Sequence, residues 1–137
     1  MKPLIKICGV ADGDNLIKLI NIEKINFLGF IFYKQSPRNA TKDFINSISN
    51  LDFKNKRAVC VYVNADREFI EETSSYFANP ILQFHGDETN AFCKSFKKDF
   101  WKVIRVKDAE SIKLITDYPD ASGILFENYE TGIYGGT

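Results

Sequence analysis

The sequence alternates short apolar runs with longer polar segments. The apolar runs are rich in Ile, Val and Phe and cover residues 4–8, 27–32, 58–63, 81–84, 101–106 and 123–127. Within each run the apolar residues follow one another rather than alternating with polar ones, which indicates strands buried on both faces. The pattern therefore predicts six buried strands at the spacing of roughly 20 to 30 residues that βαβ units require.

The polar segments between the runs carry apolar residues at three- and four-residue spacing. This spacing is typical of amphipathic helices that cover a sheet. It is clearest in the first two segments, at Leu16, Leu19, Ile20, Phe44, Ile45 and Ile48. Acidic residues stand where a carboxylate could accept the free amide hydrogens of an opening helical turn. These are Asp12 and Asp14 for the first helix, Asp66 for the third, Asp87 for the fourth and Asp108 for the fifth.

This alternation of strands and helices requires parallel strands, because each helix must return the chain to the same end of the sheet. No linker or low-complexity tract interrupts the pattern, so residues 1–137 are expected to form a single domain. The fold class is therefore α/β.

Polar side chains gather at the carboxyl end of each predicted strand, the face that builds the site in parallel α/β proteins. Contributions from every strand, rather than from one crevice, favour a (β/α)8 barrel. A closed eight-stranded barrel has two more strands than the pattern supplies, so we expect an incomplete barrel of about six strands and five helices. The alternative is a flavodoxin-like binding domain, which would need a non-sequential strand order.

Composition narrows the function classes. The chain has 18 Lys and Arg against 18 Asp and Glu. Its formal net charge is therefore zero and does not favour binding to nucleic acid or to an anionic membrane. No apolar run approaches a signal-peptide core or the roughly 20 residues of a membrane span. We therefore expect a cytoplasmic protein without nucleic-acid or membrane partners. The three cysteines form no C-x-x-C pair, which leaves room for a working thiol.

Cys8, at the end of the first predicted strand, is the first candidate for chemistry. Free cysteine is often just a small buried residue, which is our interpretation of Cys60 and Cys93. A reactive thiolate instead needs a cationic neighbour that lowers its pKa. Lys6 lies two residues back on the same side of the strand and is the obvious partner.

Further candidates follow the other strands. His85, the only histidine, precedes a glycine that lets the backbone approach a ligand, although such a histidine can also be structural. Arg38 follows a stiffening proline and could bind a carboxylate or phosphate, or lie free at the surface. Glu127 ends an apolar strand, where desolvation would raise its pKa and suit a general acid, although it could also be a solvated loop residue. Gln83 and Arg105 are candidates from their strand-end positions.

No cluster of metal ligands is visible, and neither G-x-G-x-x-G nor G-x-x-x-x-G-K-[ST] occurs. We therefore expect neither a metal nor a cofactor.

Four blocks, taken together, closely resemble phosphoribosylanthranilate isomerase, a (β/α)8-barrel enzyme of tryptophan biosynthesis. They are Lys6-Ile7-Cys8-Gly9, Leu28-Gly29-Phe30-Ile31-Phe32 with Ser36-Pro37-Arg38, Gln83-Phe84-His85-Gly86-Asp87-Glu88, and Tyr134-Gly135-Gly136-Thr137. The resemblance covers about the N-terminal two thirds of such a barrel. It implies isomerisation of N-(5'-phosphoribosyl)anthranilate to 1-(2-carboxyphenylamino)-1-deoxyribulose 5-phosphate, an Amadori rearrangement without cofactor.

The resemblance also implies residue roles. Cys8 falls on the general base of the family, and Glu127 falls on the general acid, which the family has as aspartate. Arg38 matches the arginine that meets the anthranilate carboxylate, and His85 a histidine that lines the site. Lys6, Gln83 and Arg105 are expected to contact the phosphorylated substrate. The family binds the substrate phosphate on loops after strands seven and eight, which the pattern here lacks.

A competing interpretation is a truncated, inactive barrel that self-associates. Open strand edges are templates for pairing with another chain. Under this interpretation the chain has no catalytic activity and forms a homodimer through these edges.

Overall fold

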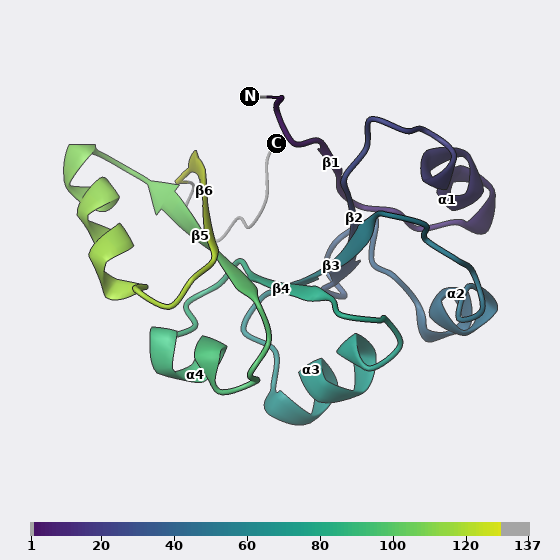
Figure 1. Ribbon diagram of the computed structural model, residues 1–137. Coiled ribbons are helices and arrows are strands. Elements are labelled where there is room, and N and C mark those ends of the chain that lie inside the picture. The colour runs from purple at the N-terminus through teal and green to yellow at the C-terminus, as the bar shows by residue number, and fades with distance from the viewer. Residues whose placement is uncertain (1, 130–137) are drawn as a thin grey trace.

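The computed structural model describes residues 2–129, and in that part the chain forms one curved parallel sheet (Figure 1). The Tyr134–Thr137 block of the resemblance lies outside the described residues. The strands are β1 (Lys6–Ile7), β2 (Phe27–Phe32), β3 (Arg57–Tyr62), β4 (Ile81–Phe84), β5 (Phe100–Val106) and β6 (Gly123–Asn128).

The strands pair in chain order, β1-β2-β3-β4-β5-β6, and every pair is parallel. A flavodoxin-like domain needs a non-sequential order, so that alternative is wrong. Figure 1 shows the sheet curling into an arc with the helices along its outer side, the arrangement of a (β/α) barrel.

The helices confirm most of the predicted caps. They are α1 (Gly13–Ile20), α2 (Lys42–Ser47), α3 (Arg67–Ser74), α4 (Asn90–Lys94) and a 3-10 helix, η1 (Ala109–Asp117). Asp12, Asp66 and Asp108 cap α1, α3 and η1, whereas Asp14 lies inside the first turn of α1. The predicted cap Asp87 is wrong, because Thr89 accepts the hydrogen bond from the Phe92 N–H at 3.2 Å.

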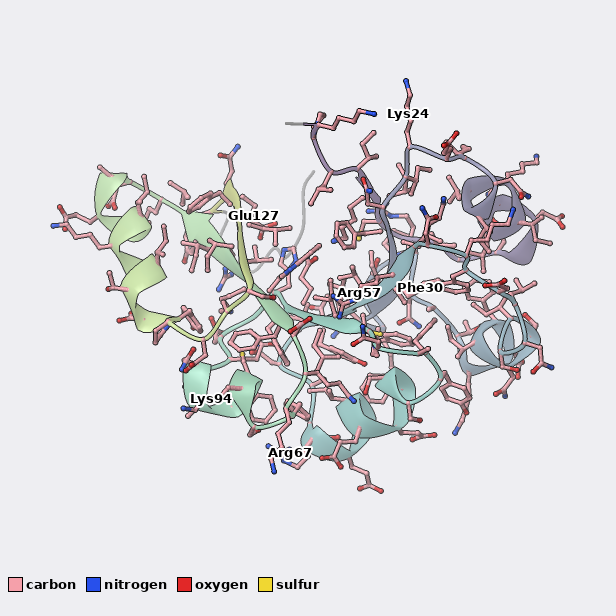
Figure 2. The ribbon with its side chains drawn as sticks, in the orientation of Figure 1. Lys24, Phe30, Arg57, Arg67, Lys94 and Glu127 are labelled. Atoms are coloured by element: carbon pink, nitrogen blue, oxygen red, sulfur yellow. The ribbon has the colours of Figure 1, made fainter. Side chains whose placement is uncertain are left out.

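Two apolar layers result from the side-chain alternation of the strands. The outer layer lies between the sheet and the helices and contains Phe30, Tyr62 and Phe84. Phe30 is seen there in Figure 2. The smaller inner layer, on the concave face, is built on Val59, Val61 and Ile81. The polar residues at the strand ends lie next to this inner layer, on the same face of the sheet.

The prediction that every strand is buried on both faces fails at β6. The strands β3 and β4 are buried almost throughout, but Phe126 on β6 is 54% exposed. In the described part of the chain, β6 pairs only with β5 and β1 only with β2. Edge strands have one neighbour instead of two, which leaves more of their side-chain surface open.

Candidate active site

A cleft of about 410 Å³ lies over the inner layer, at the carboxyl ends of the strands. Six of the seven predicted site residues line it: Lys6, Cys8, Arg38, Gln83, His85 and Glu127. Hollows of about 390 and 400 Å³ between helices and sheet contain neither cysteine nor histidine. The cleft is therefore the best candidate for acid–base chemistry.

The period-two alternation of strands explains why these side chains meet. Lys6 pairs in register with Phe27, so Cys8, two residues on, faces the same side beside Gly29. Gln83 pairs with the inner-layer residue Val61, so His85 also faces inward. Lys6, Cys8, Gln83 and His85 therefore share the inner face, whereas Arg38 reaches the cleft from a loop.

Gly29 makes room for the first pair. A Cβ atom at Gly29 would lie 3.0 Å from Cys8 Sγ and 3.0 Å from Lys6 Cε. Ordinary carbon contacts are about 3.5–4.0 Å. The missing side chain therefore allows the Cys8 thiol and the Lys6 side chain to pack together over Gly29 of β2.

Lys6 is held by several groups of the cleft. Its Nζ donates a hydrogen bond to Gln83 Oε1 and lies 5.8 Å from the centre of the Trp101 ring. Burial lowers the pKa of Lys6 below its usual value, and the interaction with Cys8 opposes part of that shift. The lysine is thus coupled electrostatically to the predicted thiolate.

Arg38 reaches the backbone of Cys8 from the loop after β2. Its Nη1 donates to the backbone oxygen of Cys8 at 3.1 Å. Gly9 has φ +81°, and a Cβ there would lie 2.5 Å from Arg38 Nη1. The glycine therefore allows a left-handed turn after β1 and leaves space for the guanidinium over it.

His85 and Glu127 form a pair across the cleft. His85 Nε2 lies 2.7 Å from Glu127 Oε2, and the two side chains are 14% and 16% exposed. The Glu127 Oε1 atom is buried and has no hydrogen-bond partner among the described residues. The carboxyl group thus has one oxygen oriented by His85 and one free of protein partners in that part of the chain.

Arg105 does not line the cleft. Its main chain pairs in register with Glu127, but its Nη2 lies 2.9 Å from Asp87 Oδ1 and its guanidinium 5.6 Å from the Tyr129 ring centre. The carboxylate of Asp87 attracts the guanidinium toward a neighbouring hollow. A substrate contact from Arg105 stays a prediction that this geometry does not favour.

Tyr33 and Gln35 also line the cleft and were not among the predicted residues. Both lie in the loop between β2 and Arg38. Their place in a loop that already held the candidate Arg38 could have indicated that they line the site. The thiols of Cys60 and Cys93 are fully buried, which confirms their assignment to the core.

Residues 2–129 contain no group of three or more His, Cys, Asp or Glu residues that could hold a metal ion. No helix in the same part of the chain is long and apolar enough to cross a membrane.

Comparison with known proteins agrees with the architecture. Residues 5–136 match the family model for N-(5'phosphoribosyl)anthranilate (PRA) isomerase. The N-(5'-phosphoribosyl)anthranilate isomerase of Nitrosomonas europaea is 35% identical over the whole chain, and that of Pseudomonas fluorescens is 35% identical over 96% of it. The chain spans 65% of the length of each of these relatives.

Solved structures give the same result. The phosphoribosyl anthranilate isomerase of Thermotoga maritima superposes on 99% of the chain, with a TM-score of 0.82 and 25% identity, and the match covers 66% of that structure. An isomerase in complex with reduced 1-(o-carboxyphenylamino)-1-deoxyribulose 5-phosphate covers 94% of the chain and 66% of that structure, with a TM-score of 0.79 and 25% identity. The chain therefore belongs to the N-(5'-phosphoribosyl)anthranilate isomerase family.

Proposed function

We propose that the protein isomerises N-(5'-phosphoribosyl)anthranilate to 1-(2-carboxyphenylamino)-1-deoxyribulose 5-phosphate, a step of tryptophan biosynthesis. The observation that carries the proposal is the single cleft in which a thiol, Cys8, and a carboxyl group, Glu127, face the same space. A rearrangement of this type needs one acid and one base on a common substrate. A relative of similar fold binds a reduced form of the product, which supports the same substrate class here.

Glu127 is assigned as the general acid. It protonates the ring oxygen of the ribose, the bond from this oxygen to C1 breaks, and the anthranilate nitrogen forms a Schiff base with C1. His85, at 2.7 Å from Oε2, fixes the orientation of this carboxyl group where Glu127 lines the cleft. The relatives' acid, as the resemblance implies, is an aspartate, so the acid here extends one methylene farther from its strand.

Cys8 is assigned as the general base. Its thiolate removes the proton from C2. The electron pair of that C–H bond forms a C1–C2 double bond, and the π pair of the C1–N bond moves to nitrogen, which gives an enolamine. The enolamine then tautomerises to the C2 ketone, so that protons are moved but none is gained or lost overall. Lys6 is assigned as the cationic partner of Cys8, with which it interacts electrostatically.

Arg38 and Gln83 are assigned to binding. Arg38 lies beside Cys8 and supplies a planar fork that suits the carboxylate of the anthranilate ring. Gln83 is buried and holds Lys6, so we assign it a contact with the sugar only through that lysine. The zero net charge supports a small-molecule substrate rather than nucleic acid, and we propose that the protein works in the cytoplasm.

Self-association is the second candidate. It is favoured by the one-sided pairing of β1 and β6 in the described residues and by the exposure of Leu4 (70%) and Phe126 (54%) near those edges. One solved relative, 26% identical, is a monomer generated from the dimeric phosphoribosylanthranilate isomerase of Thermotoga maritima. Sedimentation of the chain over a concentration series tests this candidate.

The primary test is an isomerase assay that follows the loss of the fluorescent substrate. The 137-residue chain is assayed alone and after addition of the last third of the Nitrosomonas europaea relative. We expect turnover in at least one condition and its loss in Cys8→Ala, while Cys93→Ala, which removes a thiol outside the cleft, retains it. Absence of turnover in both conditions, or turnover that survives Cys8→Ala, would contradict the proposal.

A further inference from the structure

A buried ion pair lies behind His85, on the helix-covered side of the sheet. Lys102 on β5 and Glu88 after β4 approach to 3.3 Å between Nζ and Oε1, and both side chains are 3% exposed. Neither residue lines the cleft. Burying two charges is costly, and such a pair is often no more stabilising than apolar residues of the same size. The pair is therefore better explained by the geometry that it imposes than by stability.

Glu88 joins the turns after two strands. Its Oε1 accepts the Gly86 N–H at 2.9 Å, and its Oε2 accepts the Asn64 N–H at 2.8 Å. Asn64 in turn accepts the Asp87 N–H at 2.7 Å. One carboxylate thus ties the turn that follows β4 to the turn that follows β3.

The close approach of these turns depends on Gly86. A Cβ atom there would lie 2.5 Å from Asn64 Oδ1, which no ordinary contact allows. Asn64 itself has φ 50°, a left-handed conformation that asparagine tolerates better than most residues. The two turns are therefore shaped to meet around the Glu88 carboxylate.

Lys102 holds the chain on both sides of His85. Its Nζ lies 2.5 Å from the Gly86 backbone oxygen and 3.5 Å from that of Phe84. The His85 N–H donates to the Tyr62 backbone oxygen at 2.8 Å. The peptide group before His85 and the Gly86 carbonyl beyond it are thus held by Lys102, and Glu88 holds the Gly86 N–H between them, while His85 lines the cleft.

We propose that Glu88, held by Lys102, is a positioning residue for His85 and through it for the carboxyl group of Glu127. This inference rests on the proposed isomerase function. The Glu88–Lys102 pair fixes the backbone from which the imidazole projects, and the imidazole lies 2.7 Å from Glu127 Oε2. Loss of the pair lets the turn shift, and a displacement of about 1 Å at reacting groups can cost on the order of 10²-fold in rate.

The test compares Glu88→Gln with the double variant Glu88→Gln/Lys102→Met, which removes both buried charges at similar volume. The matched control is Glu72→Gln, which breaks an exposed ion pair with Lys42 outside the cleft. The readouts are kcat and KM well below each melting temperature, and the ring NMR signal of His85, the chain's only histidine. Amide exchange at Gly86 is the third readout.

Both variants should lower kcat at least about tenfold with a smaller change in KM, shift or broaden the His85 ring signal, and raise amide exchange at Gly86 at least about tenfold. Glu72→Gln should change none of these. A folded variant with lower stability but normal kcat and an unchanged His85 signal would show a merely structural pair and overturn the inference.

The NMR and exchange readouts do not depend on activity. If the unsubstituted protein has no isomerase turnover, the proposed function fails, and the His85 signal still decides the positioning role. If Glu88→Gln alone does not fold, the double variant supplies the same comparison, because it leaves no uncompensated buried charge.

Discussion

Gly29→Ala tests whether the thiol and the lysine of the cleft work from the positions that the structure gives them. The new Cβ would lie 3.0 Å from both Cys8 Sγ and Lys6 Cε and 3.1 Å from Cys8 Cα. These separations are about 0.5 Å short of ordinary contact, so the side chains must move by about that amount. Because one of the crowded atoms is backbone, rotation of the lysine alone does not relieve the crowding.

The size of the effect follows from that displacement. If about 1 Å costs on the order of 10²-fold, a shift of about 0.5 Å should lower kcat roughly tenfold. Crowding in a packed region costs about 1–3 kcal/mol, and the gain from replacing glycine offsets about 0.4–1 kcal/mol of it. We therefore expect a modest fall in melting temperature together with a roughly tenfold fall in kcat.

The assay measures kcat, KM and the melting temperature of Gly29→Ala beside Gly13→Ala. Gly13 opens α1, and a Cβ there meets nothing within 4 Å. Gly13→Ala should keep full activity and gain up to about 1 kcal/mol, because alanine is the better helix former. Normal kcat in Gly29→Ala would refute the placement of Cys8 and Lys6 as the base and its partner.

Three further predictions follow from other contacts. Gly9→Ala should raise KM at least about tenfold, because the new Cβ displaces the Arg38 guanidinium. The positive φ at this position should also lower the free energy of unfolding by about 1–2 kcal/mol in a urea titration. An unchanged KM would contradict the binding role of Arg38. Glu127→Gln should lower kcat by about 10²–10⁴ with an unchanged circular dichroism spectrum, because an amide cannot supply the proton; near-normal turnover would exclude Glu127 as the acid. Burial raises the pKa of Cys60 from 9.0 to about 12, so the unfolded thiol ionises first and the stability present below pH 9 is lost as pH rises toward 12. Cys60 contributes at most about 1.4 kcal/mol per pH unit to this slope, and buried Cys93, whose pKa is also raised to about 12, adds its own part. Cys60→Val should therefore reduce the slope in urea titrations between pH 8 and 11, and an equal slope in the variant would show that Cys60 does not contribute.

The central strands were predictable because their signal is local. The apolar runs 27–32 and 81–84 coincide with β2 and β4, which have neighbours on both sides. The first run, 4–8, forms a ladder only at Lys6–Ile7, because the strand has one neighbour and Gly9 turns the chain away. The extent of an edge strand depends on pairing that apolar content does not encode.

The helix starts show a similar limit. A carboxylate can cap a helix only if no stronger partner takes it, and Asp87 is bound by Arg105 and Asn64 from other strands. Thr89 therefore caps α4. Those partners are distant in sequence, so the cap could not be chosen from the local pattern.

The cleft was largely predictable because strand ends of a parallel sheet meet on one face. That rule placed Cys8, His85 and Glu127 together without knowledge of any contact. It could not predict that Arg105 turns away from the cleft, nor that Glu88 and Lys102 support it from the other side. Such contacts depend on side-chain direction across the sheet rather than on spacing along the chain.

Protection of Cys8 from alkylation tests the central claim most directly, namely that these residues form one substrate cleft. Cys8 is half-buried, whereas Cys60 and Cys93 are fully buried, so iodoacetamide should label Cys8 first. The ligand is the reduced product analogue that a relative binds, added to the chain together with the last third of the Nitrosomonas europaea relative. Our account predicts that saturating analogue slows the labelling of Cys8 by roughly tenfold or more, because the bound analogue covers the thiol. It also predicts that Arg38→Met removes this protection. Equal labelling rates with and without the analogue would contradict it.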